Sequence, residues 1–317
     1  MKYVGILRQQ SSNNFKSILL LIMFPVLLLG LTWVFCAFLF PNTSGYSPEG
    51  FYVMASGEAF ASYAPIVAGA TLIWFLVAFS MHSWMISSAT HSKPLERREN
   101  KRVYNLVENL CMAHGMAMPK VNVIEEQSLN AFASGINKKS YTVTLTRGII
   151  DRLNDAELEG VIAHELCHIR NRDVRLLVVS IIFVGIFTFI AQFAMRSLWY
   201  APRRSRGGKN DGGAALMFVI VAVLAAVGYF FSMLLRFAIS RKREFMADAG
   251  AAEMTKDPRA LAMALRKIAG NPKIASVTRE DIAQLFIEHP LLKKGGFSSL
   301  FATHPPIQKR IEILEQF

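Results

Sequence analysis

The chain has 317 residues, of which 52% are hydrophobic, and its apolar excess lies in uncharged blocks, which argues against a purely soluble protein. Its three cysteines are scattered and odd in number, which argues against a disulfide framework. The net charge of +12 fits an anionic membrane surface and not a nucleic acid, because no stretch interleaves aromatic and basic residues.

The first two apolar blocks, residues 18–40 and 59–81, contain no charged residue and are each long enough to span a bilayer. The first block lacks the small residues of a cleavage site at its end, so we predict a retained anchor and not a signal peptide. The loop at 41–58 contains no Lys or Arg, whereas residues 93–102 contain five. The positive-inside rule therefore places the N-terminus and residues 82–173 in the cytoplasm.

A small sheet is predicted after the second span. Residues 97–115 have the apolar spacing of a helix, and residues 121–124 and 141–146 have the alternation of strands. The segment 130–135 lies between these strands, and an exposed edge strand there would pair with an extended substrate backbone. An ordinary hairpin strand is the alternative. The candidate substrate-binding residues are Asn130, Ala131 and Phe132.

A further helix is predicted to begin at a capping-box pattern. This helix contains the pattern H-E-x-x-H. His164 and His168 are four residues apart, so both imidazoles lie on one helix face and can bind one ion. Zn²⁺ accepts neutral imidazole ligands, and Glu165 lies where its carboxylate can act as general base toward a water. The alternative is a surface helix that carries two histidines and an ordinary glutamate.

Two further apolar runs, residues 176–195 and 214–235, are separated by a polar, glycine-rich segment that contains four basic residues between 203 and 209. If both runs span the bilayer, this basic segment lies outside, against the charge bias. A hairpin that does not cross fully is the alternative, but the length of both runs favours crossing. In either case the chain returns to the side of the H-E-x-x-H helix.

A catalytic zinc needs a third protein ligand, and the segment after the fourth run offers one. Glu244 is an acidic residue in a basic, predicted helical stretch on the correct side of the membrane. Asp248 lies four residues later on the same face, where it can accept a hydrogen bond from a ligand histidine. The alternative is an acidic pair on a solvated helix face.

These motifs, taken together, resemble those of the HtpX family of membrane-bound zinc metalloproteases, which is related to the CAAX prenyl proteases. The resemblance covers nearly the whole chain, including the two N-terminal spans. Its motifs are H-E-x-x-H with Asn171 and Asp173, Ser240-Arg241, Glu244-x-x-Ala247-Asp248, Asn130-Ala131-Phe132-Ala133 and Thr303-His304-Pro305.

The resemblance implies a role for each of five residues. It implies that one Zn²⁺ per subunit is bound by His164, His168 and Glu244. Glu165 would be the general base, and Asp248 would orient a ligand histidine.

The resemblance also implies that His304 and Arg310 stabilise the oxyanion of a tetrahedral intermediate, a role that suits N–H donors. Each residue has a simpler interpretation. His304 can be a loop residue before a helix that begins with proline, and Arg310 can be an ordinary arginine of a charged last helix.

The expected fold is an α+β membrane protein with about four hydrophobic helices and a gluzincin-like metalloprotease domain, mostly helical with a small sheet. Residues 1–81 would be an anchor with two transmembrane helices. Residues 82–175 and 236–317 would form the cytoplasmic catalytic domain, into which residues 176–235 insert a hydrophobic helix pair. The resemblance implies a multi-pass protein of the bacterial inner membrane.

The predicted function is zinc-dependent hydrolysis of peptide bonds in membrane proteins or unfolded polypeptides, and the family suggests a role in membrane-protein quality control. An inactive scaffold or chaperone with a protease fold is the alternative, although all expected catalytic residues are present. An intramembrane protease is disfavoured by the charged residues around the H-E-x-x-H motif. A transporter is disfavoured because the four apolar runs contain no ionisable residue near their centres.

Overall fold

The computed structural model describes residues 6–39, 48–200, 219, 221–223, 225–230, 241–270, 285–287 and 305–317. The chain divides into two compact units. One unit comprises Met1–Ser17, Met81–Ile181 and Leu235–Phe317, and the other comprises Ile18–Ser80 and Ile182–Leu234.

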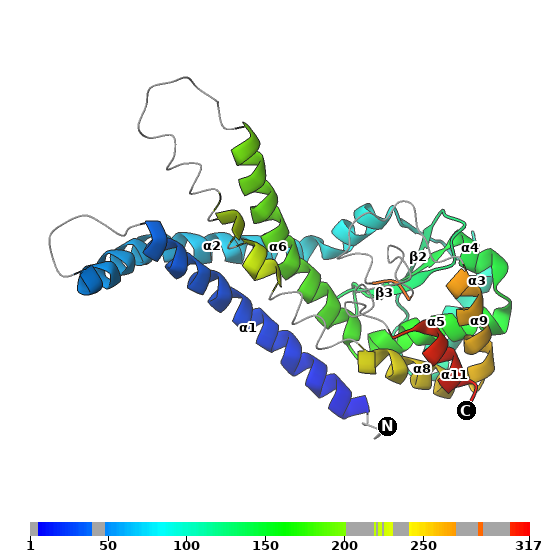
Figure 1. The fold of residues 1–317 in the computed structure, drawn as a ribbon. Helices are drawn as coiled ribbons and strands as arrows, with labels where there is room; N and C mark the ends of the chain where they lie inside the picture. Colours follow the sequence, from blue (N-terminus) through cyan, green and yellow to red (C-terminus); the bar gives the residue numbers. More distant parts are fainter. Residues whose placement is uncertain are drawn as a thin grey trace. The chain divides into compact units, whose positions relative to one another are not determined.

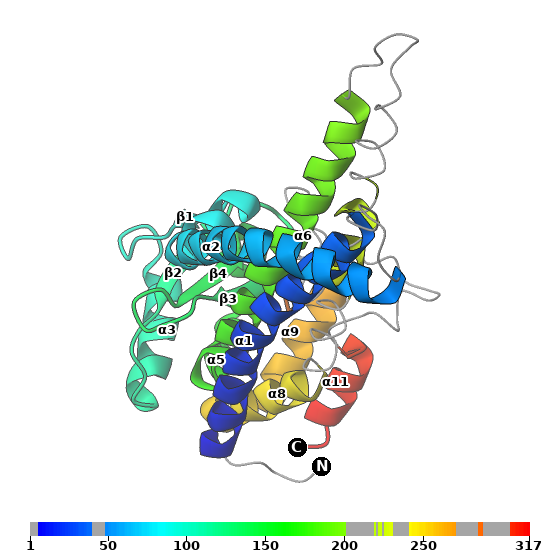
Figure 2. The same ribbon diagram turned by 90° about the vertical axis from the view of Figure 1, so that its left-hand side faces the viewer.

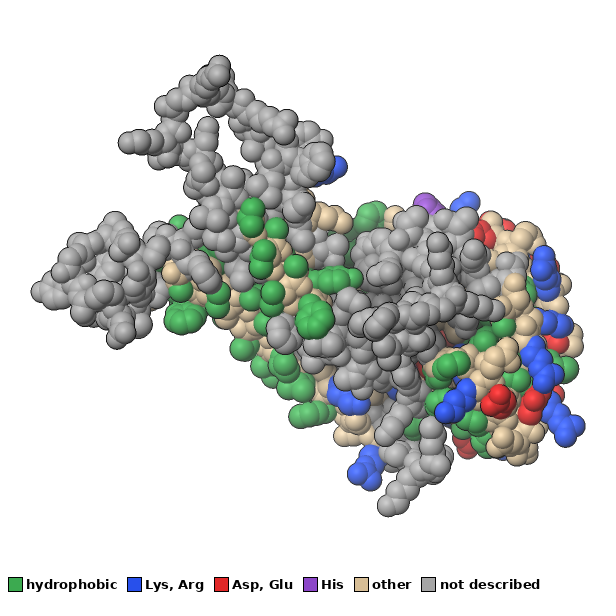
Figure 3. Space-filling model, viewed as in Figure 1, with side chains coloured by type: hydrophobic (Ala, Val, Ile, Leu, Met, Phe, Trp, Pro, Cys, Tyr) green, Lys and Arg blue, Asp and Glu red, His purple; other side chains and the backbone are tan. Residues whose placement is uncertain are grey.

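Long apolar helices dominate the second unit. Helix α1 (Ile6–Leu39) and helix α2 (Pro48–Thr90) contain two stretches, Ser11–Ala37 and Gly57–Thr90, that are long and apolar enough to cross a membrane. Hydrophobic side chains lie exposed along their described parts (Figure 3), as expected for surfaces in contact with lipid. Both helices extend beyond the predicted spans at one end or both.

The other two predicted apolar runs are described in part. Residues 176–195 lie within the single helix α6 (Asp173–Tyr200), and a shorter apolar helix, Val221–Phe230, covers part of the fourth run. Within the second unit, the rings of Phe24 and Phe187 pack edge to face with centroids 5.2 Å apart. Complete crossing by these two runs stays a prediction.

The first unit contains a mixed four-stranded sheet, in the order β1-β2-β4-β3. Its strands are β1 (Lys93–Pro94), β2 (Lys120–Ile124), β3 (Ala131–Ser134) and β4 (Thr142–Thr146). β2 and β4 are parallel, whereas β1 and β3 pair antiparallel with their neighbours. The small sheet and the three predicted strands are therefore confirmed, and β3 is an edge strand as the substrate-strand prediction requires.

Helix α5 (Asp155–Arg170) lies between β3 and α8 (Arg241–Thr255) in the core of this unit (Figures 1 and 2). Its predicted capping box is confirmed, because Asn154 and Glu157 exchange side chain–backbone hydrogen bonds. The remaining helices of the unit are α3 (Lys101–Ala113), α4 (Arg147–Arg152), α9 (Pro258–Gly270) and α11 (Ile307–Leu314).

Helix α8 approaches α5 closely because a glycine faces it. A Cβ atom on Gly250 would lie 2.7 Å from the Sγ atom of Cys167, which is shorter than real Cβ contacts. The small residues Ala247 and Ala251 flank this contact and are completely buried. The resulting close packing holds the first turn of α8 beside the histidines of α5.

Candidate metal centre

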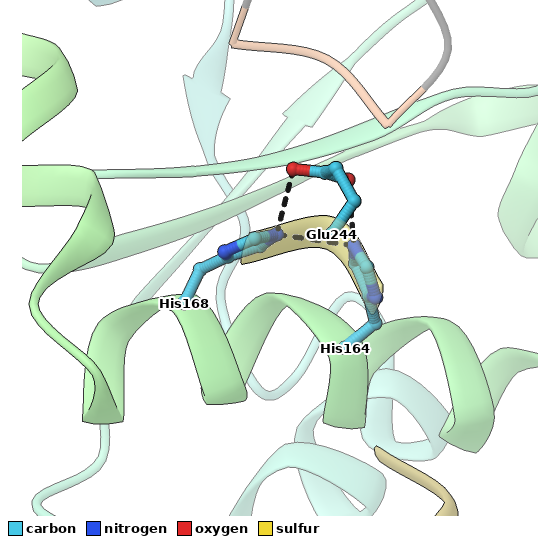
Figure 4. A group of neighbouring side chains, drawn as sticks. All are labelled: His164, His168 and Glu244. Atoms are coloured by element: carbon cyan, nitrogen blue, oxygen red, sulfur yellow. Dashed lines mark hydrogen bonds and ion pairs between the residues drawn. The ribbon is translucent and has the colours of Figure 1, made fainter. Parts of the chain in front are cut away.

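The two histidines of the H-E-x-x-H motif lie on one face of α5 and direct their Nε2 atoms toward the same point (Figure 4). The Nε2 atoms of His164 and His168 are 3.1 Å apart. The side chain of His164 is buried, whereas that of His168 retains 12% exposure. His168 is therefore the less buried of the two histidines.

Glu244, in the first turn of α8, brings its carboxylate to this pair (Figure 4). The nearest carboxylate oxygens lie 3.6 Å from Nε2 of His164 and 3.5 Å from Nε2 of His168. Tetrahedral zinc with bonds of about 2.0–2.1 Å keeps its ligand atoms about 3.3 Å apart. Two imidazoles and a carboxylate are the donor types that zinc accepts, one ligand atom from each residue lies within 4.8 Å of the others, and among the described residues they are the one such group of three.

Each histidine is held by a carboxylate on its other ring nitrogen. Nδ1 of His164 lies 3.0 Å from Asp248, and Nδ1 of His168 lies 3.1 Å from Asp173. A carboxylate at Nδ1 fixes the tautomer that leaves Nε2 as an acceptor for a metal. The sequence predicted this position for Asp248 but gave Asp173 no role. The sequence feature that could have identified Asp173 is its position as an acidic residue in the first helical turn after the H-E-x-x-H helix.

Arg310 of α11 lies behind the metal-binding side chains. Its guanidinium is completely buried and donates from Nε and Nη2 to the two oxygens of Asp248, at 2.9 and 2.7 Å. Burial by itself raises the pKa of Asp248, but the charge of Arg310 together with the hydrogen bonds from His164 and Arg310 outweighs this effect and lowers the pKa to about 2. Arg310 and His164 thus both favour the ionised form of Asp248.

Glu165 follows the first histidine on α5 and is buried. Burial raises the pKa of its carboxyl group above the usual value, and the neighbouring His164 and His168 oppose that rise. A carboxylate with a raised pKa is a better proton acceptor near neutral pH than an exposed one. The position and environment of Glu165 suit a general base.

Strand β3 contacts α5, and one backbone acceptor on its outer edge is already hydrogen-bonded within the chain. The backbone N–H of Ile287 donates to the carbonyl of Ala131 at 2.9 Å, and the Phe286 ring packs edge to face on Phe132. Asn130 is buried and accepts from the backbone of Thr146 on the β4 side. The candidate substrate strand therefore lies beside the metal centre, with one outward acceptor engaged by Ile287.

The remaining predicted site residue, His304, lies outside the described residues. Arg310 lies near the centre but has its guanidinium engaged with Asp248; its Nη1 is 3.6 Å from Glu244. The structure thus brings together His164, His168, Glu244, Asp248 and Arg310, and Glu165 is close enough to feel the charges of both histidines.

Comparisons with known proteins show which family the chain belongs to. Residues 97–317 match the model of Peptidase family M48. A Protease HtpX homolog of Bacteroides fragilis is 58% identical, with the full length of both chains aligned. One of Lactobacillus acidophilus is 33% identical over 97% of this chain and 98% of its own. A crystal structure of S. mikatae Ste24p gives a TM-score of 0.48 at 19% identity, over 80% of this chain and 58% of that chain.

A helix with the H-E-x-x-H motif and a carboxylate from a second helix define the class of metallopeptidases. The chain belongs to peptidase family M48 and, within it, to the HtpX proteases. With its two helices long enough to span a bilayer, it is a membrane metalloprotease.

Proposed function

We propose that the chain is a zinc endopeptidase that cleaves membrane-anchored or unfolded polypeptides at the cytoplasmic surface of the bacterial inner membrane. The observation that carries this proposal is the convergence of the two Nε2 atoms, 3.1 Å apart, with the Glu244 carboxylate, whose Oε2 lies 3.6 Å from His164 and whose Oε1 lies 3.5 Å from His168. His164, His168 and Glu244 would hold one zinc ion per subunit.

Different side chains have different roles in the proposed hydrolysis. Zinc, when bound, supplies Lewis acidity that lowers the pKa of a water and polarises a peptide carbonyl. Glu165 removes the proton of the attacking water and passes it to the nitrogen of the leaving amine. Asp248 and Asp173 keep His164 and His168 in the tautomer that presents Nε2.

The position of the centre in the chain supports a membrane-anchored substrate. His168 lies only five residues before Asp173, where α6 begins, and the apolar run of that helix starts at residue 176. The excess of basic residues at 93–102 supports a cytoplasmic orientation. Segments emerging from the bilayer would reach the edge of β3 as extended chains. A role in removing misfolded membrane proteins follows from this substrate class.

Roles for His304 and Arg310 at the oxyanion stay predictions from the family resemblance. The two hydrogen bonds that Arg310 donates to Asp248 also support a second role for Arg310, which is to orient this carboxylate. The convergence of the three donors, and the carboxylates at both Nδ1 atoms, support a protease over an inactive scaffold.

The test is metal analysis and proteolysis with the detergent-purified protein, comparing wild type with Glu165→Gln on an unfolded membrane-protein substrate. We expect one zinc per chain in both proteins and a loss of at least about a hundredfold in cleavage rate in the variant. Equal rates would overturn the role of Glu165. Absence of zinc and of cleavage in the wild type would overturn the proposed function in favour of the scaffold.

A further inference from the structure

The side chain of Asn13, in the third turn of α1, reaches the turn that follows the metal-binding helix. It is completely buried and donates one N–H to the carbonyl of Asn171, at 2.8 Å, and the other to Oδ1 of Asp173, at 2.6 Å. Both partners are acceptors, so the amide nitrogen must face them. These early turns of α1, up to Ser17, belong to the same compact unit as α5.

Asp173 connects this amide to the metal centre. Its Oδ1 accepts from Asn13, and its Oδ2 lies 3.1 Å from Nδ1 of His168. The carboxylate plane is thereby fixed at both oxygens, and its second oxygen fixes the imidazole ring. A hydrogen-bonded path therefore leads from the first helix of the chain to one of the metal-binding nitrogens, across 160 positions of sequence.

The turn that contains Asp173 has an unfavourable backbone conformation, which the two hydrogen bonds of Asn13 stabilise. Arg172 has a positive φ of 60°, a conformation that residues other than glycine rarely adopt and that persists only when surrounding contacts enforce it. The two hydrogen bonds of Asn13 fall on the residues immediately before and after it, Asn171 and Asp173. Without them, the turn has fewer contacts to hold the Asp173 carboxylate in register with His168.

We propose that Asn13 is a positioning residue of the metal centre, which acts through Asp173 to orient His168 and so makes metal affinity depend on the beginning of the anchor helix. The inference rests on the proposed function, because it assumes that His168 binds the metal. Carboxylates that orient a ligand histidine raise metal affinity by about 10–100-fold, and loss of the group that holds such a carboxylate should cost toward the lower end of that range.

The test is the apparent zinc dissociation constant of the full-length protein in detergent, measured by competition with a zinc-chelating dye. We expect Asn13→Ala to weaken zinc binding about tenfold, and Asp173→Ala about 10–100-fold. Asn13→Asp keeps the size of the side chain but replaces a donor by an acceptor, so it should weaken binding at least as much. Asn14→Ala is the matched control, since no hydrogen bond among the described residues joins Asn14 to Asp173.

The double variant Asn13→Ala/Asp173→Ala separates a path through Asp173 from a general loss of structure. If Asn13 acts through Asp173, the double variant binds zinc as weakly as Asp173→Ala alone. Full additivity of the two losses, or binding by both Asn13 variants within twofold of Asn14→Ala, would overturn the inference. If the wild type and Asn14→Ala bind no zinc either, the proposed function fails instead. The absorption bands of Co²⁺ bound in place of zinc give a second readout of His168 geometry.

Discussion

Arg310→Met tests whether the buried guanidinium stabilises the carboxylate behind the metal centre. Arg310 is the one lysine or arginine that is buried among the described residues, and it makes two short hydrogen bonds to Asp248. Methionine fills a similar volume but leaves the Asp248 charge buried without its guanidinium partner. Breaking a buried pair in this way costs about 3–5 kcal/mol. For a domain of this size that loss lowers the unfolding temperature by on the order of 10 °C.

The assay is thermal unfolding of the metal-free protein in detergent, followed by circular dichroism. The matched control is Arg266→Met, because Arg266 pairs with Glu315 at an exposed position and should contribute less than about 1 kcal/mol. Adding Asp248→Asn to Arg310→Met should recover most of the lost stability, since it removes the stranded charge. If Arg310→Met unfolds at the same temperature as Arg266→Met but loses proteolysis, the reasoning is refuted and the oxyanion role is favoured.

Three further changes test other parts of the site. Glu244→Ala should abolish stoichiometric zinc binding while the fold is retained, and metal analysis that still finds one zinc per chain would exclude it as a ligand. Gly250→Val should lower the unfolding temperature by several degrees, because its side chain would collide with Cys167 across the α5–α8 contact; unchanged stability would contradict that close packing. Ile287→Pro removes the N–H that hydrogen-bonds to the Ala131 carbonyl, which frees this carbonyl to pair with a substrate backbone. KM for unfolded substrates should therefore fall, whereas Ile287→Val should leave KM unchanged. A higher KM for the proline variant would argue against substrate pairing at this edge.

The parts of the site that follow a local rule could be predicted from the sequence. The spacing of His164 and His168 sets a common helix face, and the capping box at Asn154 marks the beginning of that helix. The prediction of Glu244 as a ligand required one more step, namely that its segment and the H-E-x-x-H helix lie on the same side of the membrane. Each of these inferences depends on periodicity or on topology, which a single sequence contains.

The contacts of Asn13 and Arg310 could not be predicted in the same way. Asn13 is a polar residue ahead of an apolar run, a position where solvated side chains are common, and its partner is 160 residues away. Arg310 lies on an amphipathic last helix, where an exposed arginine is the ordinary expectation. No periodicity or spacing rule relates either residue to its carboxylate, because the pairing depends on how separate helices pack.

These two residues also explain why the metal centre can be both polar and buried. Orienting two histidines requires two carboxylates, Asp248 and Asp173, and a buried carboxylate is costly unless its remaining acceptors are satisfied. Arg310 satisfies one carboxylate with a charge, and Asn13 satisfies the other with a neutral amide. The better-buried histidine, His164, is thus associated with the charged partner, and the more exposed His168 with the neutral one.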